Sequence, residues 1–199
     1  MGDSPLRVIV VGGAGAMGRW AVRALVRLGT ASELTIADID AARAQTLVDE
    51  LSGPCRALAL DASDSAAMRA AFTGQDVVLN AMGPFATFFE AVFVAALESG
   101  CHYVDINDDW QPTLTAFDYD ALARGNGLHA VIGLGGSPGE TNLFAMVAAR
   151  HLDEVHELHT GWRLSGAVTV DEPSYPATSA SAAVEHWLHQ VSSQIYTWD

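Results

Sequence analysis

The stretch RVIVVGGAGAMGRWAVRAL, residues 7–25, decides the fold of this chain. An apolar run of strand length over residues 7–11 leads directly into a glycine-rich turn, and a helical pattern follows until Gly29. The turn contains the pattern GxGxxG, with its glycines at Gly13, Gly15 and Gly18. This pattern is weak alone, but between a strand and a helix it is typical of a dinucleotide-binding unit.

Each glycine of the turn is expected to have its own task. Gly13 permits the tight turn, Gly15 lets backbone amides approach a pyrophosphate, and Gly18 lets the helix pack on the sheet. The helix amino end faces the phosphates. We therefore predict that Gly13, Gly15, Ala16, Met17 and Gly18 bind a cofactor. The alternative is a glycine-rich turn without a ligand.

Two aspartates at later strand ends extend the predicted cofactor site. Asp38 ends the second strand, twenty positions after Gly18, where an acid binds the ribose hydroxyls of NAD. A 2′-phosphate would be repelled there, and Arg43 lies a helical turn further on, so NAD is favoured while NADP stays open. A strand-end cap also accounts for Asp38. Asp61 in LALDASD is either a contact to the adenine edge or an Asx turn.

Strand-like runs alternate with helical patterns along most of the chain. The runs cover residues 7–11, 33–37, 56–60, 76–79, 102–106 and 129–133, and the helical patterns cover residues 20–28, 41–51, 65–72 and 88–99. This alternation predicts an α/β fold, a Rossmann-type doubly wound parallel sheet with helices on both faces. Asp40 and Asp64 precede two of the helices as expected N-caps.

The sequence pattern changes after Ala149. Residues 158–164 alternate as in a half-exposed strand, and residues 179–191 place apolar side chains at helical spacing. We predict a nucleotide-binding domain over residues 1–152 and the start of a mixed α/β substrate domain over residues 153–199. One strand, one helix and a stub cannot enclose a core. The chain is therefore expected to be a fragment, one of two complementary chains, or a shortened relative that depends on a partner.

Composition excludes several classes of function. The formal net charge is −14, from 24 acidic and 10 basic residues, so nucleic acid and anionic membranes are not expected partners. The sequence has no lysine, which excludes Schiff-base chemistry through an enzyme lysine. Cys55 and Cys101 lack CxxC spacing and predict buried thiols in a reducing compartment. With no signal-peptide or membrane-span pattern, a cytoplasmic protein is expected.

The remaining ligand contacts are expected beyond the carboxyl ends of strands four and six, where an open parallel sheet binds its ligand. The fourth strand ends in NAMGPF, and we predict that Asn80, Ala81, Gly83 and Pro84 contact the cofactor. Phe85 is either a residue near the nicotinamide and the substrate or part of the core.

The sixth strand ends in GLGGSPGETN. Ser137 and Glu140 predict a capping box, with Pro138 in the first helical position. The same helix start is a candidate site for a substrate carboxylate, with Thr141 and Asn142 alongside.

The fifth strand ends in HYVDINDDW, residues 102–110. Asp105, Asn107 and Asp109 copy the first ligand positions of an EF-hand loop, but Trp110 replaces the required glycine, which excludes a calcium loop. The histidines complete no plausible metal set either, so no metal is expected. A helix cap, a proton-transfer carboxylate and a polar clamp for substrate remain open. A carboxylate beside apolar walls can act as acid or base, so Asp105 and Asp108 are the predicted catalytic residues.

The segments GGAGAMGRWAVRAL, NAMGPF, HYVDINDDW and GGSPGETN, in this order and spacing, resemble the saccharopine dehydrogenase family, also called saccharopine reductase-like. The resemblance covers nearly the whole chain. It implies a nucleotide-binding domain, a mixed substrate domain inserted after the sixth strand, and a returning chain that completes the first domain. It places beside the nicotinamide Gly83, Pro84, Phe85, Asp105 and Asp108, and in a PG-containing turn Pro138 and Gly139.

The resemblance implies NAD(P)-linked reduction of an imine to a secondary amine, or the reverse oxidation. Saccharopine-forming members tend to carry Tyr at the position of Phe85 and His at that of Asn142, so another amino-acid-like substrate is implied. Two functions stay open: an oxidoreductase that acts on a C–N bond as part of a complete chain or complex, and a non-catalytic NAD(P)-binding module or regulatory partner. The expected partners are a small amino-acid-like molecule and a second copy or complementing chain that supplies the missing substrate domain.

Overall fold

A computed structural model describes residues 6–161 of the 199-residue chain. Strands and helices alternate along it as the sequence pattern predicts. The elements are β1 (Leu6–Val11), α1 (Gly18–Leu28), β2 (Ala31–Asp38), α2 (Ala41–Glu50), β3 (Cys55–Ala59), α3 (Ser65–Phe72), β4 (Val77–Asn80), α4 (Phe85–Glu98), β5 (His102–Asp105), α5 (Trp110–Asp118), α6 (Asp120–Gly125), β6 (Ala130–Val131) and α7 (Glu140–Ala149).

The six strands form one parallel sheet in the order β3-β2-β1-β4-β5-β6. The chain builds outward from β1 to β3, crosses over, and builds outward in the other direction from β4 to β6. This reversal at β1 and β4 confirms the doubly wound fold, and it is the point where such sheets bind their ligands.

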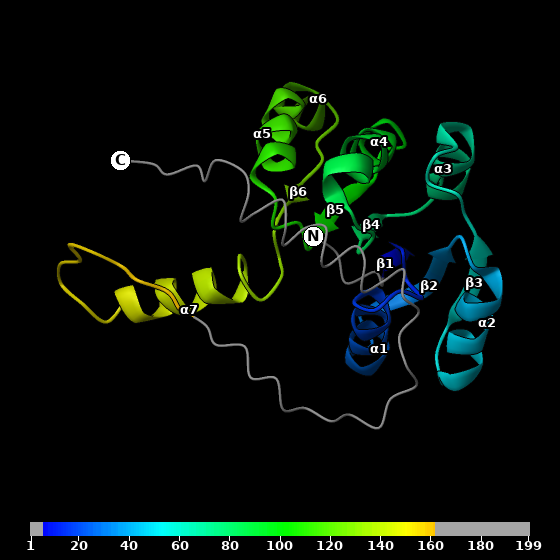
Figure 1. Ribbon diagram of the computed structural model, residues 1–199, viewed down its shortest axis with the longest axis horizontal. Coiled ribbons are helices and arrows are strands. Elements are labelled where there is room, and N and C mark those ends of the chain that lie inside the picture. Colours follow the sequence, from blue (N-terminus) through cyan, green and yellow to red (C-terminus); the bar gives the residue numbers. More distant parts are fainter. Residues whose placement is uncertain (1–5, 162–199) are drawn as a thin grey trace.

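Two hydrophobic clusters cover the two faces of the sheet. Successive side chains of a strand point to opposite faces, so β1 places Val8 and Val10 in one cluster and Ile9 and Val11 in the other. Helices α1 and α2 cover the first face, and helices α3 to α6 cover the second (Figure 1). The second cluster contains stacked and edge-to-face rings, with Phe93 lying 4.8 Å from Tyr103 between ring centroids.

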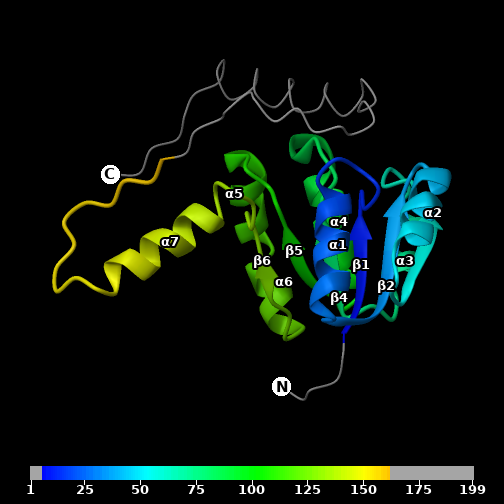
Figure 2. The ribbon, with the colours of Figure 1, turned by 90° about the horizontal axis from the view of Figure 1, so that it is seen from below.

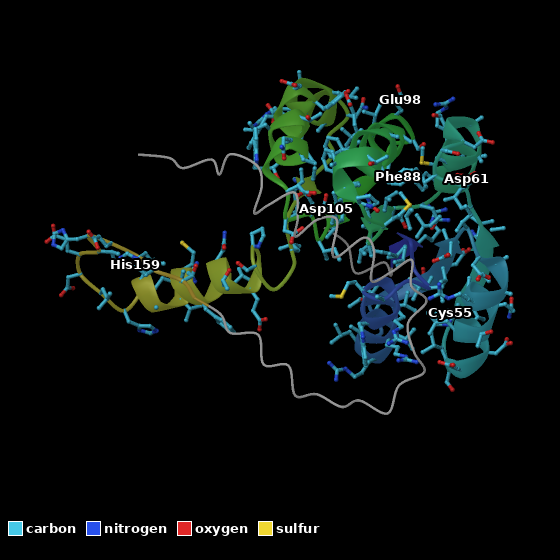
Figure 3. The ribbon with its side chains drawn as sticks, viewed as in Figure 1. Cys55, Asp61, Phe88, Glu98, Asp105 and His159 are labelled. Atoms are coloured by element: carbon cyan, nitrogen blue, oxygen red, sulfur yellow. The ribbon has the colours of Figure 1, made fainter. Side chains whose placement is uncertain are left out.

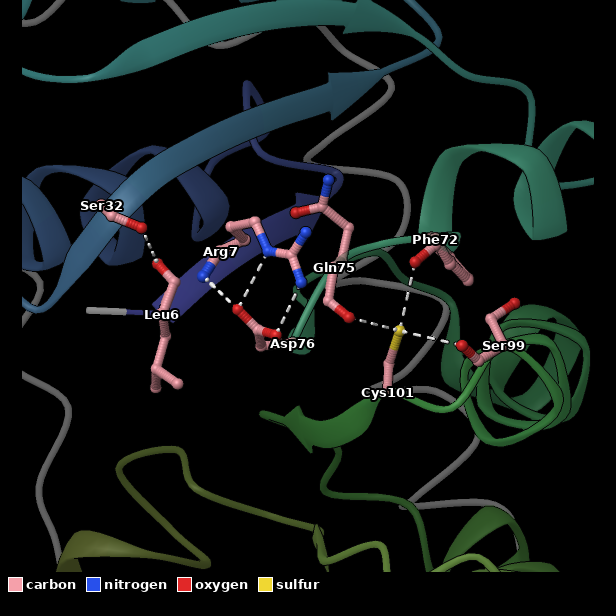
Figure 4. Close-up of polar contacts among 8 residues, drawn as sticks. All are labelled: Leu6, Arg7, Ser32, Phe72, Gln75, Asp76, Ser99 and Cys101. Carbon is pink, nitrogen blue, oxygen red and sulfur yellow. Dashed lines mark hydrogen bonds and ion pairs between the residues drawn. The ribbon is translucent and has the colours of Figure 1, made fainter. Parts of the chain in front are cut away.

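Polar contacts hold the amino edge of the sheet (Figure 4). The Arg7 guanidinium makes two hydrogen bonds to the Asp76 carboxylate, at 3.0 and 3.2 Å. The Cys101 thiol lies 3.3 Å from the carbonyl oxygens of both Phe72 and Gln75. Burial raises the pKa of Cys101 to about 11, so this thiol stays protonated at neutral pH and is not a nucleophile.

Helix α7 extends away from the sheet (Figures 1 and 2) and has no buried residue. Residues 150–161 that follow it contain no helix or strand. The strand predicted over residues 158–164 is therefore absent from its described part, and the rest of it lies outside the described residues, as does the helix predicted over residues 179–191. None of the helices in residues 6–161 is long and apolar enough to cross a membrane.

Candidate functional site

The carboxyl ends of the parallel strands bring four distant segments of the chain together. In the sheet register Val11 pairs with both Ala37 and Asn80, and Asn80 pairs with Asp105. The glycine-rich turn, the end of β2, the NAMGPF loop and the DINDDW loop are therefore neighbours at one edge. The predicted roles of the candidate residues at this edge stay predictions.

The glycine-rich turn has room for little more than hydrogen at its glycine positions. A Cβ on Gly18 would overlap the Gly12 carbonyl oxygen and would lie 2.8 Å from the Gly13 Cα. A Cβ on Gly15 would lie 3.0 Å from the same carbonyl oxygen. The residue with a positive φ in the turn is Gly12, at 70°, and not Gly13. At Gly13 a side chain is excluded because an added Cβ would lie 2.9 Å from the Ile36 side chain. The backbone can thus approach a ligand closely.

The amino end of α1 is open to an anion. Met17 occupies the N-cap position, and no side chain in the described part of the chain makes a cap hydrogen bond there. The first amides of a helix lack partners within the helix, so those at Ala16, Met17 and Gly18 are suited to a pyrophosphate. The turn and the helix start therefore fit a dinucleotide, and the cofactor role of these residues stays a prediction.

Asp38 and Arg43 converge on a single residue of the glycine-rich turn. Asp38 Oδ2 accepts a hydrogen bond from the Ala14 amide at 3.1 Å, and its Oδ1 accepts from the Asp40 amide at 3.0 Å. Arg43 Nη2 donates to the Ala14 carbonyl at 3.0 Å. In the sequence Arg43 lies a helical turn beyond the end of the second strand, and in the structure the first turn of α2 brings its guanidinium back to the loop. A carboxylate and a cation thus lie together where the ribose is expected.

The two predicted helix caps are confirmed, and the Asx turn at Asp61 is present. Asp40 accepts hydrogen bonds from the Ala42 and Arg43 amides, and Asp64 does the same for α3. Asp61 Oδ1 accepts from the amide and hydroxyl of Ser63, at 2.8 and 2.7 Å, and these bonds lower the pKa of Asp61. Figure 3 shows Asp61 beside α3. Its contact with adenine stays a prediction.

The end of β4 is tied to the interior. Asn80 is buried, its Oδ1 accepts from the Met82 amide at 3.0 Å, and its Nδ2 donates to the Tyr103 hydroxyl at 3.1 Å. The Ala81 amide donates to Val11, which fixes the loop next to the glycine-rich turn. Gly83 is exposed, and Pro84 precedes α4 directly. The predicted contacts of Asn80, Ala81, Gly83 and Pro84 with a cofactor stay predictions that this geometry permits.

Phe85 packs into the core at the start of α4. Its side chain is 8% exposed and belongs to the core cluster with α4 and β5. This burial agrees with the core interpretation, and a contact between Phe85 and the nicotinamide or the substrate stays an untested prediction.

Asp105 joins two loops from inside the molecule. It is 0% exposed, and its Oδ1 accepts from the Asn107 amide at 3.0 Å and the Gly133 amide at 2.8 Å. Its Oδ2 is buried without a hydrogen-bond partner in the described residues. Burial raises the pKa of Asp105, although the two amides and Tyr103 act in the opposite direction. Figure 3 labels Asp105 near the end of β5.

The two predicted catalytic carboxylates thus differ in their surroundings. Asp108 is exposed three residues further on, whereas Asp105 is enclosed and holds the loops after β5 and β6 together. Only Asp108 is placed for direct contact with a small molecule. The catalytic role stays a prediction for both.

A pocket of about 500 Å³ opens beside Asp108. It is lined by Asn107, Asp108, Asp109, Trp110, Thr113, Leu114, Phe117 and Pro138. Asn107 shapes its floor, because its Nδ2 donates to the Asp109 carbonyl and to the Thr113 hydroxyl, both at 3.0 Å. Sequence reasoning missed the contribution of α5. The signal was the spacing of Trp110, Leu114 and Phe117, which places three apolar side chains on one helix face.

The predicted capping box at the start of α7 is wrong. The helix begins at Glu140, and Gly139 stands in the N-cap position with φ of 113° and no side-chain cap. This backbone conformation is not helical, so Gly139 cannot continue a helix that begins at Pro138. Pro138 lines the pocket instead.

Thr141 and Asn142 lie in the first turn of α7, outside the pocket lining. The Thr141 hydroxyl lies 3.3 Å from Asn142 Oδ1. Glu140 adds a negative charge at the same helix start, which works against a substrate carboxylate there. Their substrate role stays a prediction. Within residues 6–161, no group of three His, Cys, Asp or Glu side chains is placed to hold a metal ion.

Comparisons with known proteins give one family and a partial overlap in length. The family described as saccharopine dehydrogenase NADP binding domain matches residues 8–170. Carboxyaminopropylagmatine dehydrogenase from Synechocystis sp. is 27% identical over 161 residues, which are 75% of this chain and 40% of that protein. The chain thus spans less than half the length of this curated relative.

Solved structures agree on the fold. Apo saccharopine dehydrogenase (L-Glu forming) from Saccharomyces cerevisiae has a TM-score of 0.62 and 19% identity, and the match covers 73% of this chain and 31% of that one. Triphenylmethane reductase from Citrobacter sp. has a TM-score of 0.50 and 18% identity, over 63% of this chain and 47% of that one. Both similarities concern the architecture of the sheet and its helices.

Proposed function

This chain belongs to the saccharopine dehydrogenase family, and on that premise we propose that it is the NAD(P)-binding part of an oxidoreductase that acts on a C–N bond of an amino-acid-like substrate. The observation that carries the proposal is the family match over residues 8–170, which includes both the glycine-rich turn and the DINDDW loop. The glycine-rich turn suits a dinucleotide, and the carboxylates of the DINDDW loop suit an amine, so the two segments together suit both reactants.

The proposed contacts with the cofactor come from several segments at the carboxyl edge of the sheet. The amides at Ala16, Met17 and Gly18 hold the pyrophosphate, and the β4 loop with Gly83 and Pro84 flanks the nicotinamide. NAD(P), when bound, supplies or accepts the hydride at the carbon of the C–N bond. Asp61 contacts the edge of the adenine. The positions of these residues near the carboxyl ends of the strands support these assignments.

The carboxylates act on the amine side of the substrate. Asp108 is exposed in the loop after β5. There its carboxylate stabilises positive charge on the reacting nitrogen and exchanges a proton with that nitrogen. Asp105 acts through the backbone, because it holds the Asn107 and Gly133 amides and so fixes the loop that carries Asp108. Asp105 is therefore a positioning residue in this proposal.

Two relatives support the substrate class. The names of the Synechocystis and yeast proteins give carboxyaminopropylagmatine and saccharopine as the substances on which they act. Of these, we propose that this chain acts on a compound closer to the first, since Phe85 and Asn142 depart from the residues of saccharopine-forming members.

The function is tested with the full natural polypeptide in two steps. NADH and NADPH are titrated by their fluorescence, and secondary-amine amino acids are then screened for oxidation with NAD⁺ or NADP⁺. Binding of a nucleotide followed by oxidation of at least one secondary amine is the expected result. Binding without oxidation across the screen would favour a non-catalytic module, and absence of nucleotide binding would contradict both functions.

The choice between NAD and NADP is expected to depend on Asp38 and Arg43. Because Arg43 uses one of its five N–H donors on Ala14, the others remain for a 2′-phosphate. Arg43→Ala is expected to weaken NADPH binding about tenfold and to change NADH binding little. Asp38→Ala is expected to weaken NADH binding by a similar factor. Dissociation constants for both nucleotides, measured with each variant, check this result.

Arg27→Ala is the matched control, because Arg27 is an exposed arginine in the last turn of α1, away from the loop. It removes the same charge and should leave both affinities unchanged. Equal losses for NADH and NADPH in Arg43→Ala would show that Arg43 only supports the loop. Unchanged NADH affinity in Asp38→Ala would remove the ribose assignment.

A further inference from the structure

A row of four buried polar side chains crosses the carboxyl ends of β4 and β5. Its members, here called the buried polar network, are Asn80, Tyr103, Asp105 and Asn107, and each is at most 1% exposed. The sheet register sets Asn80 opposite Asp105, and Tyr103 lies two residues earlier on the same face of β5. Buried polar groups cost free energy unless they are paired, and a paired network holds the segments around it rigidly.

Each end of the network holds one loop of the site. At one end Asn80 Oδ1 accepts a hydrogen bond from the Met82 amide at 3.0 Å, inside the NAMGPF loop. At the other end Asp105 Oδ1 accepts from the Asn107 amide at 3.0 Å, inside the DINDDW loop. Asn107 Nδ2 then donates to the Thr113 hydroxyl at 3.0 Å, which extends the network to α5. The network therefore reaches both the cofactor side and the substrate side of the proposed site.

The Tyr103 hydroxyl lies between these two ends. It accepts a hydrogen bond from Asn80 Nδ2 at 3.1 Å, which leaves its own hydrogen to be donated. Burial and then the charge of Asp105 raise the pKa of Tyr103, so the hydroxyl and that carboxylate are within electrostatic reach of each other. Asp105 Oδ2 has no hydrogen-bond partner among residues 6–161. The donor of Tyr103 and the acceptor of Asp105 are thus available to each other.

From this arrangement we propose that Tyr103 is a positioning residue, whose hydroxyl couples the NAMGPF loop to the DINDDW loop so that NAD(P) bound against the first loop orders the second. A ligand that holds the NAMGPF loop closed keeps Asn80 in place, and any opening further along the network then leaves buried groups unpaired. By linkage, ordering of the DINDDW loop by a substrate favours NAD(P) binding to the same extent. The inference rests on the proposed function for the place of the cofactor.

Hydrogen–deuterium exchange on the full natural polypeptide measures this coupling without catalysis. The exchange of amides in residues 106–113 is followed with and without saturating NADPH. In the unchanged protein NADPH is expected to slow this exchange about fivefold, the lower end of usual couplings between two sites. In Tyr103→Phe, which keeps the ring and removes only the hydroxyl, the slowing should fall below about twofold. NADPH should still protect residues 12–19 in the variant, which shows that it is folded and binds the cofactor.

Tyr119→Phe is the matched control for this substitution. The Tyr119 ring also lies edge-on to Phe93, at 5.9 Å between centroids against 4.8 Å for Tyr103. Its hydroxyl donates to Glu90 in an exposed hydrogen bond outside the buried polar network. Tyr119→Phe removes one hydroxyl and one hydrogen bond from the same aromatic cluster, and it should leave the slowing of residues 106–113 at its full value.

Slowing that is lost in Tyr103→Phe and kept in Tyr119→Phe would support the coupling. If NADPH binds the unchanged protein without slowing residues 106–113, the coupling is contradicted before any variant is made. Slowing that persists in Tyr103→Phe would show direct contact between cofactor and loop, and equal loss in Tyr119→Phe would show a general effect on the core. Either result would overturn the role of Tyr103 alone. Absence of NADPH binding to the unchanged protein would contradict the proposed function, and this inference with it.

Discussion

Replacing Gly18 with alanine is expected to abolish NADPH binding and to lower the free energy of unfolding by about 3 kcal/mol. The added methyl group overlaps the Gly12 carbonyl oxygen and lies 2.8 Å from the Gly13 Cα. Both obstacles are backbone atoms, so no side chain can rotate away to make room. Either α1 moves outward from β1 or the turn opens, and both changes displace the amides that face the pyrophosphate. NADPH fluorescence titration and urea unfolding check this result.

Gly125→Ala is the matched control for this substitution. Gly125 ends α6, has no atom within 4 Å of an added Cβ, and does not have a positive φ. It should therefore keep NADPH binding and full stability, since alanine in a helix is at least as favourable as glycine. NADPH binding of normal affinity by Gly18→Ala would show that the turn does not need the close packing seen in the structure.

Asp105→Ala is expected to lower the free energy of unfolding by about 2–6 kcal/mol, because the Asn107 and Gly133 amides both lose their buried acceptor, at roughly 1–3 kcal/mol each. Asp105→Asn keeps an acceptor oxygen of the same shape and should cost much less. It also carries an amide group in place of the Oδ2 atom, which has no partner in the described residues. Urea unfolding of the two variants measures the difference. Equal losses would show that the two amides do not depend on this side chain.

The pH dependence gives a second measurement on the same residue. Burial raises the pKa of Asp105 above the value near 3.8 that applies to the unfolded chain, so the folded state holds this proton more tightly. The contribution of Asp105 to the free energy of unfolding is therefore greatest below its pKa in the unfolded chain, and it falls as the pH rises through its pKa in the folded protein. Asp105→Asn does not titrate. The stability of the unchanged protein relative to Asp105→Asn should thus decrease from about pH 3 to neutral pH.

Features that depend on nearby residues could be predicted from the sequence. Asp40 and Asp64 reach amides two and three residues ahead, and such short contacts form in almost any tertiary setting. The alternation of apolar runs and helical patterns predicted the doubly wound sheet, because each pattern fits one kind of element and parallel strands need helices between them. The start of α7 was predicted wrongly, since Gly139 pairs with Gly135 and takes a φ of 113°, a turn that the capping-box pattern does not reveal.

What the sequence determined by itself is therefore the doubly wound sheet, the nucleotide-binding turn and the edge at which the candidate residues meet, since periodicity and turn residues set all three. What only the tertiary structure decided is which residues far apart in the sequence come into contact. Arg43 reaches Ala14 across 29 positions, and Asp105 binds the Gly133 amide across 28. Such contacts depend on how helices and loops pack around the sheet. For that reason the burial of Asp105, the return of Arg43 and the pocket beside α5 appear only when the chain is folded.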